Sequence, residues 1–205
     1  MITWQFIVTA FVVVIAPGTG VIYTLAMGLG RGRIASLAAA VGCTFGIVPH
    51  LLAATLGLAA VLHTSALLFN VVKFAGVAYL LWMAWGALRQ TGALAVKPAE
   101  QVSDPLWRVA WRGTLINVLN PKLSIFFLAL LPPFLSGDPA RATLEMALLG
   151  AVFMAMTFAV FAVYGVFAGT CRAWILSPER AMAWLNRSFA AVFAALAGRL
   201  ALERA

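Results

Sequence analysis

The sequence predicts an all-α integral membrane protein with six transmembrane helices. Of its 205 residues, 64% are hydrophobic and only 10% are charged, whereas soluble domains contain about 25% charged residues. The mean hydropathy is +1.01, and long uncharged runs recur along the chain. Because a helix needs roughly 20 apolar residues to cross the hydrocarbon core, residues 1–205 have room for about six spans in a single transmembrane domain.

The first predicted helix covers residues 1–30, which carry no charge. Pro17, Gly18 and Gly20 lie inside it, and a proline in a helix interior removes a backbone hydrogen bond. Unsatisfied backbone groups in lipid cost several kcal/mol each, so such a break persists only where protein or water covers it. We therefore predict a break that exposes backbone groups, with Thr19 as its side-chain donor. A simple packing kink is the alternative.

The second and third predicted helices share one uncharged run, from residue 34 to residue 72, which is too long for a single span. Its most polar point is His63-Thr64-Ser65. We therefore place the second helix at about 34–62 and the third at about 66–88. Lys73 is the only charge in the third helix.

A polar connection separates the two halves of the chain. It runs from about residue 89 to residue 112 and ends in an amphipathic stretch that carries Trp107 and Trp111. The fourth predicted helix follows over residues 113–134, and its only charge is Lys122.

Each of the last two predicted helices begins after a turn that contains proline. Asp138-Pro139 forms a good N-cap and N1 pair for the fifth helix, which runs to about residue 169. Ser177-Pro178 repeats this pattern before the sixth helix, whose uncharged core over residues 188–198 is short. The arginines at both ends of that core are long enough to snorkel to the two surfaces. We predict a span there, with an interfacial helix as the alternative.

The basic residues in the connections predict the orientation of the six spans. Nine of them fall on one side of the membrane and three on the other, and cytoplasmic loops carry the excess of lysine and arginine. Both termini are therefore predicted to face outward. The net charge of +8 suits the anionic cytoplasmic leaflet and not nucleic acid, because basic residues are absent from most of the chain.

Two matched helix breaks predict an internal duplication. Pro17 and Pro121 are about half the chain apart, and each lies in the first helix of a three-helix group. Because three is odd, the second group starts from the opposite face of the membrane, which makes the repeats inverted. Repeat one covers about 1–88 and repeat two about 113–205, joined by the cytoplasmic connection at about 89–112. Interrupted helices at matching positions indicate a transporter's binding site.

The sequence Asn120-Pro121-Lys122 predicts the start of a new half-helix inside the fourth span. Asparagine is a favoured N-cap, and proline is preset for the first helical position. The N-terminus of a helix carries roughly half a positive charge, and Lys122 adds a whole one. We expect a substrate carboxylate to bind there. The alternative is that Lys122 snorkels to the interface.

Three further residues are candidates for the site. His50 is an ionisable group within the second helix and a candidate proton relay, although a histidine with satisfied hydrogen bonds is equally consistent with the sequence. Lys73 lies about two turns inside the third helix, and Tyr79 offers an aromatic face. The alternatives are snorkelling for Lys73 and ordinary packing for Tyr79.

Several sequence blocks, distributed over nearly the whole chain, resemble those of the LysE/RhtB family of amino-acid exporters. The blocks are Pro17-Gly18, Gly42 with Gly46 and His50, residues 73–80, Asn120-Pro121-Lys122, Phe126-Phe127, and Leu131-Pro132-Pro133-Phe134. This resemblance implies a secondary transporter of the bacterial inner membrane, in which the distribution of basic residues places both termini in the periplasm. It implies export of neutral amino acids or close analogues driven by the proton gradient, and it adds Phe126 to the substrate-binding residues.

Two departures from the family pattern affect the substrate. Family members often have Pro-Gly-Pro followed by Asn or Asp where this chain has Thr19 and Gly20. Many also carry an acidic residue in the fifth helix where this chain has Thr157. A cationic side chain would lack a carboxylate partner within the membrane, so we predict a neutral substrate and poor export of lysine.

Other function classes fit the sequence less well. An ion exporter of the same broad superfamily is the alternative, but hard cations need several oxygen ligands and no carboxylate lies deep in a predicted span. A thiol–disulfide enzyme would need cysteines beside the helix breaks, whereas Cys43 and Cys171 lie elsewhere. We therefore predict a protein that is not an enzyme and has no metal or cofactor. Its partners are an amino acid and the lipid bilayer, and the sequence leaves open whether it forms a homo-oligomer.

Overall fold

The computed structural model describes residues 2–16, 18–62 and 104–170, and isolated helical residues between 71 and 89 and between 187 and 201. Every regular element in this part of the chain is helical, which confirms the all-α prediction. Two of its helical segments, Arg33–Gly57 and Pro139–Ala168, are long and apolar enough to cross a membrane, and two bent helix pairs raise the number of candidate spans to four. The predicted third and sixth helices lie mainly outside the described residues.

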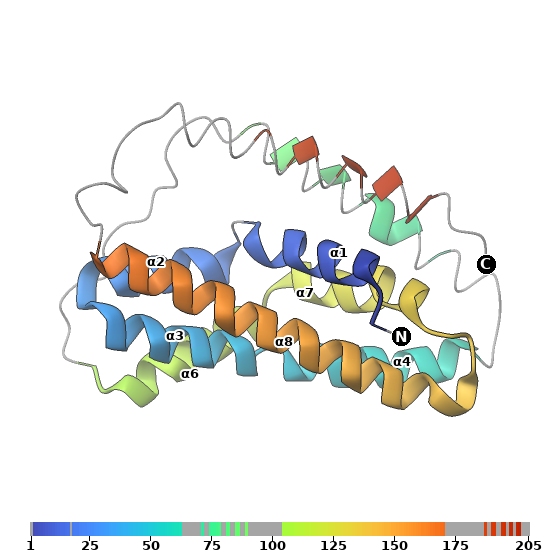
Figure 1. Cartoon of the computed structure of the whole chain (residues 1–205), viewed down its shortest axis with the longest axis horizontal. Coiled ribbons are helices and arrows are strands. Elements are labelled where there is room, and N and C mark those ends of the chain that lie inside the picture. Colours follow the sequence, from blue (N-terminus) through green and yellow to red (C-terminus); the bar gives the residue numbers. More distant parts are fainter. Residues whose placement is uncertain are drawn as a thin grey trace.

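The elements are labelled in chain order (Figure 1). They are α1 (Trp4–Ile15), α2 (Thr19–Arg31), α3 (Arg33–Phe45), α4 (Val48–Leu62), α6 (Leu106–Val118), α7 (Pro121–Ile125), the π-helix η1 (Phe126–Leu130), the 3-10 helix η2 (Pro132–Phe134) and α8 (Pro139–Thr170).

The helices α1 and α2 form the first bent pair, with an angle of 56° between them. The Thr3 side chain caps α1 by accepting a hydrogen bond from the N–H of Phe6 at 3.2 Å. After α1, the backbone of Ala16 is extended, and the extended Gly18 is the N-cap of α2. The predicted break in the first helix is therefore confirmed.

The predicted second helix has nearly the expected bounds but is divided into α3 and α4. Pro49 has no N–H to donate to the carbonyl of Phe45, so the α-helical ladder is interrupted, and the chain turns at Gly46 and Ile47. A β-carbon on Gly46 would lie only 2.6 Å from the carbonyl oxygen of Thr114 in α6. Small residues thus allow α3 and α6 to pack closely, as in many membrane helix pairs.

The second bent pair starts with α6 and continues into α7, with an angle of 53°. α6 begins at Leu106, several residues before the predicted end of the polar connection. The two tryptophans of that stretch, Trp107 and Trp111, are one helical turn apart and both exposed. An amphipathic spacing of this kind forms a helix rather than a loop. The pair is broken between α6 and α7, at the predicted position.

A π-helical turn follows α7, where prolines end the regular ladder. Pro132 and Pro133 have no N–H, and the N–H of Leu131 donates to the carbonyl of Phe126 at 3.0 Å, five residues back. Phe126 and the adjacent Phe127 are both buried. Their rings pack on Phe153 of α8, with centroid distances of 4.4 and 5.3 Å. π-helical turns frequently lie at functional sites.

α8 is the longest of the described helices, with 32 residues. It begins after Asp138, as predicted, and the Asp138 carboxylate accepts a hydrogen bond from the N–H of Ala140 at 3.0 Å. The helix crosses the molecule from end to end (Figure 1) and packs against α1, α2, α3 and α4. It therefore gives the broken helices a common continuous support.

Large apolar side chains lie exposed along the outer faces of the described helices. Leu56 in α4 is 73% exposed and Leu144 in α8 is 63% exposed, and Leu52, Leu148 and Phe158 are exposed as well. Exposed apolar surface of this extent marks a membrane or protein contact. On helices long enough to span a bilayer, this exposed apolar surface is suited to contact with lipid chains.

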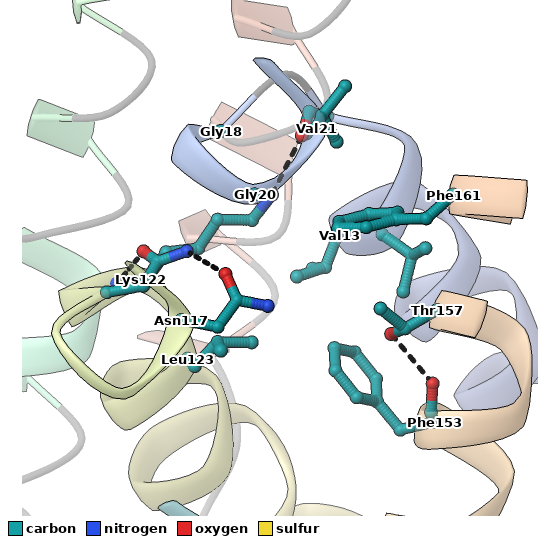
Figure 2. A pocket seen from close by; sticks show the side chains of 13 residues that line it. Val13, Gly18, Gly20, Val21, Asn117, Lys122, Leu123, Phe153, Thr157 and Phe161 are labelled. Atoms are coloured by element: carbon teal, nitrogen blue, oxygen red, sulfur yellow. Dashed lines mark hydrogen bonds between the residues drawn. The ribbon is translucent and has the colours of Figure 1, made fainter. Parts of the chain in front are cut away.

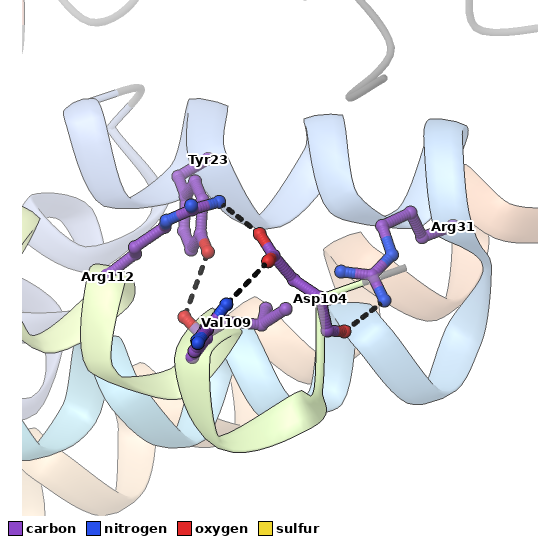
Figure 3. Close-up of polar contacts among 6 residues, drawn as sticks. Tyr23, Arg31, Asp104, Val109 and Arg112 are labelled. Carbon is purple, nitrogen blue, oxygen red and sulfur yellow. Dashed lines mark hydrogen bonds and ion pairs between the residues drawn. The ribbon is translucent and has the colours of Figure 1, made fainter. Parts of the chain in front are cut away.

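The end of α2 is held to the start of α6 by a group of charged residues that we call the Asp104 cluster: Arg31, Asp104, Arg108 and Arg112 (Figure 3). The Asp104 carboxylate is 9% exposed and pairs with Arg112 at 2.7 Å and with Arg108 at 3.5 Å. Arg31 donates to the backbone carbonyl of Asp104 at 2.6 Å. The carboxylate in this cluster is therefore neutralised.

Candidate functional site

A pocket with an empty volume of about 310 Å³, including its open mouth, lies where the two helix breaks approach α8. Its walls come from the end of α1, the start of α2, the α6–α7 break and the middle of α8 (Figure 2). The polar side chains that line it are Asn117, Asn120, Lys122 and Thr157. The two breaks, which are far apart in the sequence, thus contribute to one site.

The position of the pocket along α8 shows how deep it lies. Phe153, Thr157 and Phe161 line it, and their spacing of four residues places them on one face of the helix. At a rise of about 1.5 Å per residue, Phe153 is about 21 Å from the start of α8 and Phe161 about 14 Å from its end. The pocket is therefore far from both ends of this helix.

The α6–α7 break provides the positively charged side of the pocket. Asn120 is the N-cap of α7 and Pro121 its first residue, as predicted. The Asn120 side chain accepts a hydrogen bond from the backbone N–H of Lys122 at 3.1 Å, and the N–H of Leu123 donates to the Asn120 carbonyl. The first backbone amides of α7 are thus already bonded. The Lys122 ammonium remains as the strong donor on this side.

The Lys122 side chain reaches across the pocket to the other helix break. Its Nζ donates to the carbonyl oxygen of Ala16, which follows α1, at 2.9 Å. Tyr164 of α8 donates to the neighbouring carbonyl of Ile15 at 3.1 Å. The last carbonyls of a helix lack α-helical partners and form the negative end of the helix dipole. An ammonium group is therefore well accommodated there.

Apolar side chains complete the pocket. Val13 and Val14 from α1, Val21 from α2 and Leu123 from α7 join the two phenylalanines of α8. None of the described residues that line the pocket is acidic. The pocket thus combines a cation, the C-terminal end of a helix and an apolar wall, which together suit a small zwitterion with an uncharged side chain.

Asn117 is a central residue of the site that the sequence analysis did not select. It is 2% exposed, and its Nδ2 donates to the carbonyl of Cys43 at 2.7 Å while its Oδ1 accepts from Asn120 at 3.4 Å. A β-carbon on Gly20 would lie 2.6 Å from that Oδ1. One signal in the sequence could have identified Asn117. It is a polar residue within an apolar run, and residues three positions apart, such as Asn117 and Asn120, lie on the same face of a helix.

His50 lies beside the pocket and is linked to it through Asn117. Its Nε2 is 2.8 Å from the carbonyl oxygen of Asn117, and its Nδ1 is 2.9 Å from the hydroxyl of Ser124. Because a carbonyl only accepts, Nε2 carries the hydrogen, and in the neutral ring Nδ1 accepts from Ser124. The ring is buried and both of its nitrogens have partners.

The other predicted site residues have different positions. Gly18 lines the pocket, whereas Thr19 and Pro121 are exposed and do not line it. Phe126 is buried behind the wall, stacked on Phe153. Pro17, Lys73 and Tyr79 lie outside the described residues. Across the part of the chain that the structure describes, no group of three or more His, Cys, Asp or Glu side chains is arranged to hold a metal ion.

Comparison with known proteins identifies relatives along almost the whole chain. A homoserine/homoserine lactone efflux protein of Salmonella typhimurium is 28% identical over 98% of this chain and 96% of its own length. A leucine efflux protein of Enterobacter sp. is 26% identical over 97% and 94%. An uncharacterized membrane protein of Vibrio cholerae is 31% identical over 98% and 96%. No solved structure matches the chain significantly.

The family assignment agrees with these relatives. The sequence model of the LysE type translocators matches residues 11–204, which include both helix breaks and every described residue that lines the pocket. The chain therefore belongs to the LysE-type translocator family.

Proposed function

We propose that this protein exports neutral amino acids or close analogues from the cytoplasm across the bacterial inner membrane, and that the pocket at the two helix breaks binds them. The observation that carries the proposal is the Lys122 ammonium. It lies in the pocket on the carbonyl of Ala16 and has no carboxylate partner among the described residues.

The substrate carboxylate binds Lys122 in this proposal. An ammonium group has three N–H donors, and the bond to Ala16 uses one of them. Two donors remain for an anion, and a charge-assisted hydrogen bond is roughly twice as strong as a neutral one. The positive end of the α7 dipole, which continues into η1, adds to this attraction.

The substrate ammonium binds the end of α1. Carbonyls at half-helix C-termini bind cations in transporters with broken helices, and the bond from Lys122 to Ala16 is an ammonium interaction of this kind. The substrate's two charged groups then meet two opposite helix poles. The apolar side chains of the pocket are left for the substrate side chain.

The chemistry of the residues that line the pocket favours substrates with uncharged side chains. A lysine or arginine side chain in this pocket would be buried without a carboxylate, which is costly. The relatives named for efflux of homoserine and leucine support the same substrate class. They do not favour the alternative of an ion exporter.

Proton coupling through His50 is part of the proposal. Protonation of Nδ1 would turn the Ser124 hydroxyl from donor to acceptor, while Nε2 keeps its bond to the carbonyl of Asn117. Because Asn117 also lines the pocket, the charge on the protonated ring would strengthen the bond from Nε2 to a residue of the substrate site.

Six spans in two inverted repeats, with both termini in the periplasm, complete the proposal. The matched bends of 56° and 53° and the excess of basic residues in the predicted cytoplasmic connections support it. Single cysteines introduced at Gln101 and Ala205 are expected to react with an impermeant reagent from opposite sides of the membrane. Labelling from the same side would exclude the six-span arrangement.

The test of the binding site is efflux from loaded cells, normalised to the amount of inserted protein. Cells that express the protein are expected to export homoserine or leucine, and to export lysine poorly. Lys122→Met should insert normally and lose export about 10- to 100-fold, the equivalent of one hydrogen bond to a charged group. Arg141→Met, which removes an exposed charge at the start of α8, is the control. Normal export by Lys122→Met would refute the proposed site.

The test of coupling is the response of efflux to an imposed pH gradient in vesicles. His50→Gln retains hydrogen-bonding capacity but cannot take up a proton. We expect it to move substrate down a concentration gradient without acceleration by the pH gradient. His63→Gln removes the chain's other histidine and is the control. Acceleration of the His50→Gln variant as in the wild type would exclude His50 as the coupling residue.

A further inference from the structure

We propose that Thr157 selects the substrate side chain, because its hydroxyl oxygen accepts a hydrogen bond from a hydroxyl group on that side chain. The inference rests on the proposed function. It assigns to the pocket a preference for hydroxylated amino acids, such as homoserine and threonine, over aliphatic amino acids of the same shape.

Thr157 lies where a side chain held at the helix breaks would meet α8. It is the polar member of the face that α8 turns toward the pocket, with Phe153 one turn before it and Phe161 one turn after it. It is only 2% exposed. Figure 2 shows Thr157 and Lys122 on opposite sides of the pocket. A substrate carboxylate at Lys122 therefore leaves the Thr157 side to the rest of the molecule.

The hydrogen of the Thr157 hydroxyl is already used. Oγ1 donates to the carbonyl of Phe153, four residues earlier, at 2.9 Å. A hydroxyl has one donor and two acceptor lone pairs, so Thr157 can offer the pocket only an acceptor. The group that it recognises must be a donor.

A hydroxyl on the substrate side chain is the donor that fits. The substrate ammonium is assigned to the carbonyls at the end of α1, beside Lys122. The phenyl rings that flank Thr157 make its surroundings apolar. An aliphatic side chain placed there leaves the oxygen without a second partner, whereas a hydroxyl satisfies it. Sites built to bond a substrate hydroxyl reject analogues that lack it more strongly than apolar sites distinguish a methylene.

The test uses two substrates of nearly equal shape. Homoserine ends in a hydroxyl where norvaline ends in a methyl group, so their ratio of efflux isolates the hydrogen bond. Cells loaded with an equal mixture are expected to export homoserine faster through the wild-type protein. Thr157→Val, which replaces the hydroxyl by a methyl group, should lower the homoserine-to-norvaline ratio about five- to tenfold. Homoserine efflux should fall while norvaline efflux is retained or rises.

Two further variants separate selection from folding. Thr157→Ser keeps the hydroxyl and should keep the ratio close to that of the wild type. Thr55→Val is the matched control. Thr55 donates to the carbonyl of Leu51 at 2.8 Å in the same four-residue pattern, but it lies in α4 and does not line the pocket. Thr55→Val should leave the ratio unchanged.

The possible outcomes are distinct. An unchanged ratio in Thr157→Val, or an equal loss of both substrates, would overturn the inference and leave the exporter assignment standing. If the wild-type protein exports neither amino acid above the level of cells without it, the proposed function fails and this inference fails with it.

Discussion

Lys122 and the Asp104 cluster place basic side chains in two very different settings. In the Asp104 cluster, at the junction of α2 and α6, two arginines pair with one carboxylate at 2.7 and 3.5 Å. Lys122, in the pocket beside the middle of α8, donates to a backbone carbonyl and pairs with no carboxylate among the described residues. The first arrangement neutralises charge within the protein, and the second does not.

Under the proposed function, this difference separates the substrate site from a structural contact. A charge deep in a membrane is expensive unless it is paired, and retaining one without a carboxylate makes sense when a ligand provides it. The carbonyl of Ala16 holds the ammonium in place without cancelling its charge. The Asp104 cluster, in contrast, is complete without a ligand and serves to join two helices.

The largest effect is expected from giving Lys122 an internal carboxylate. Asn120→Asp keeps a good helix N-cap, because aspartate and asparagine are equivalent there, but it places a negative charge beside Lys122. The carboxylate competes with the substrate, and export should fall about 10- to 100-fold, the equivalent of a hydrogen bond to a charged group. The measurement is efflux per inserted molecule, together with thermal unfolding in detergent.

The control is the opposite substitution, aspartate to asparagine, at the N-cap of α8. Asp138→Asn alters the N-cap residue of α8, which is exposed and far from the pocket, and should leave export unchanged. Asn120→Asp also loses the bond to Oδ1 of Asn117, so some loss of thermal stability is expected. Export at the wild-type level per inserted molecule would contradict the comparison.

A smaller effect, on stability, is expected from removing the carboxylate of the Asp104 cluster. Asp104→Asn removes the carboxylate that pairs with Arg108 and Arg112, and its cost should be about 1–3 kcal/mol of unfolding free energy. Export per inserted molecule should stay within about twofold, because the cluster joins helices and does not line the pocket. Loss of export without loss of stability would mean that the cluster takes part in transport.

The smallest effect is expected from a matched pair of tyrosines. Tyr164→Phe removes the bond to the carbonyl of Ile15 at the first helix break. Tyr23→Phe removes the bond to the carbonyl of Val109 beside the Asp104 cluster, at 2.9 Å. Each change should cost about 1 kcal/mol of stability, but only Tyr164→Phe should also reduce export. Equal export by the two variants in the same efflux assay would contradict the distinction between the pocket, which takes part in transport, and the Asp104 cluster, which joins helices.

Features that depend on neighbouring residues in the chain were predictable from the sequence. The break before Gly18, the Asn120 cap with Pro121 after it, and the start of α8 at Asp138-Pro139 all follow from cap and proline chemistry. These predictions concern single turns, where short-range sterics and hydrogen bonds decide the conformation.

Features that depend on contacts between helices were not predictable. The role of Asn117 arises because α3 brings the Cys43 carbonyl to it and α4 brings His50. The sequence analysis predicted one continuous second helix and not the turn at Gly46 and Ile47 against α6. Thr157 was noted as a departure from the family pattern. Only the packing of α8 shows that it faces Lys122 across the pocket.

If the pocket binds the transported molecule, as we propose, the unbroken course of α8 also shows how far that molecule must travel on either side. The distance along the helix from Phe153 to Phe161 is about 12 Å, while the hydrocarbon core is about 30 Å thick. The pocket wall thus covers more than a third of the barrier, and each remaining approach averages about 9 Å, less than two helical turns. Under the proposed function, one or two layers of side chains on either side then separate the bound substrate from the membrane surfaces.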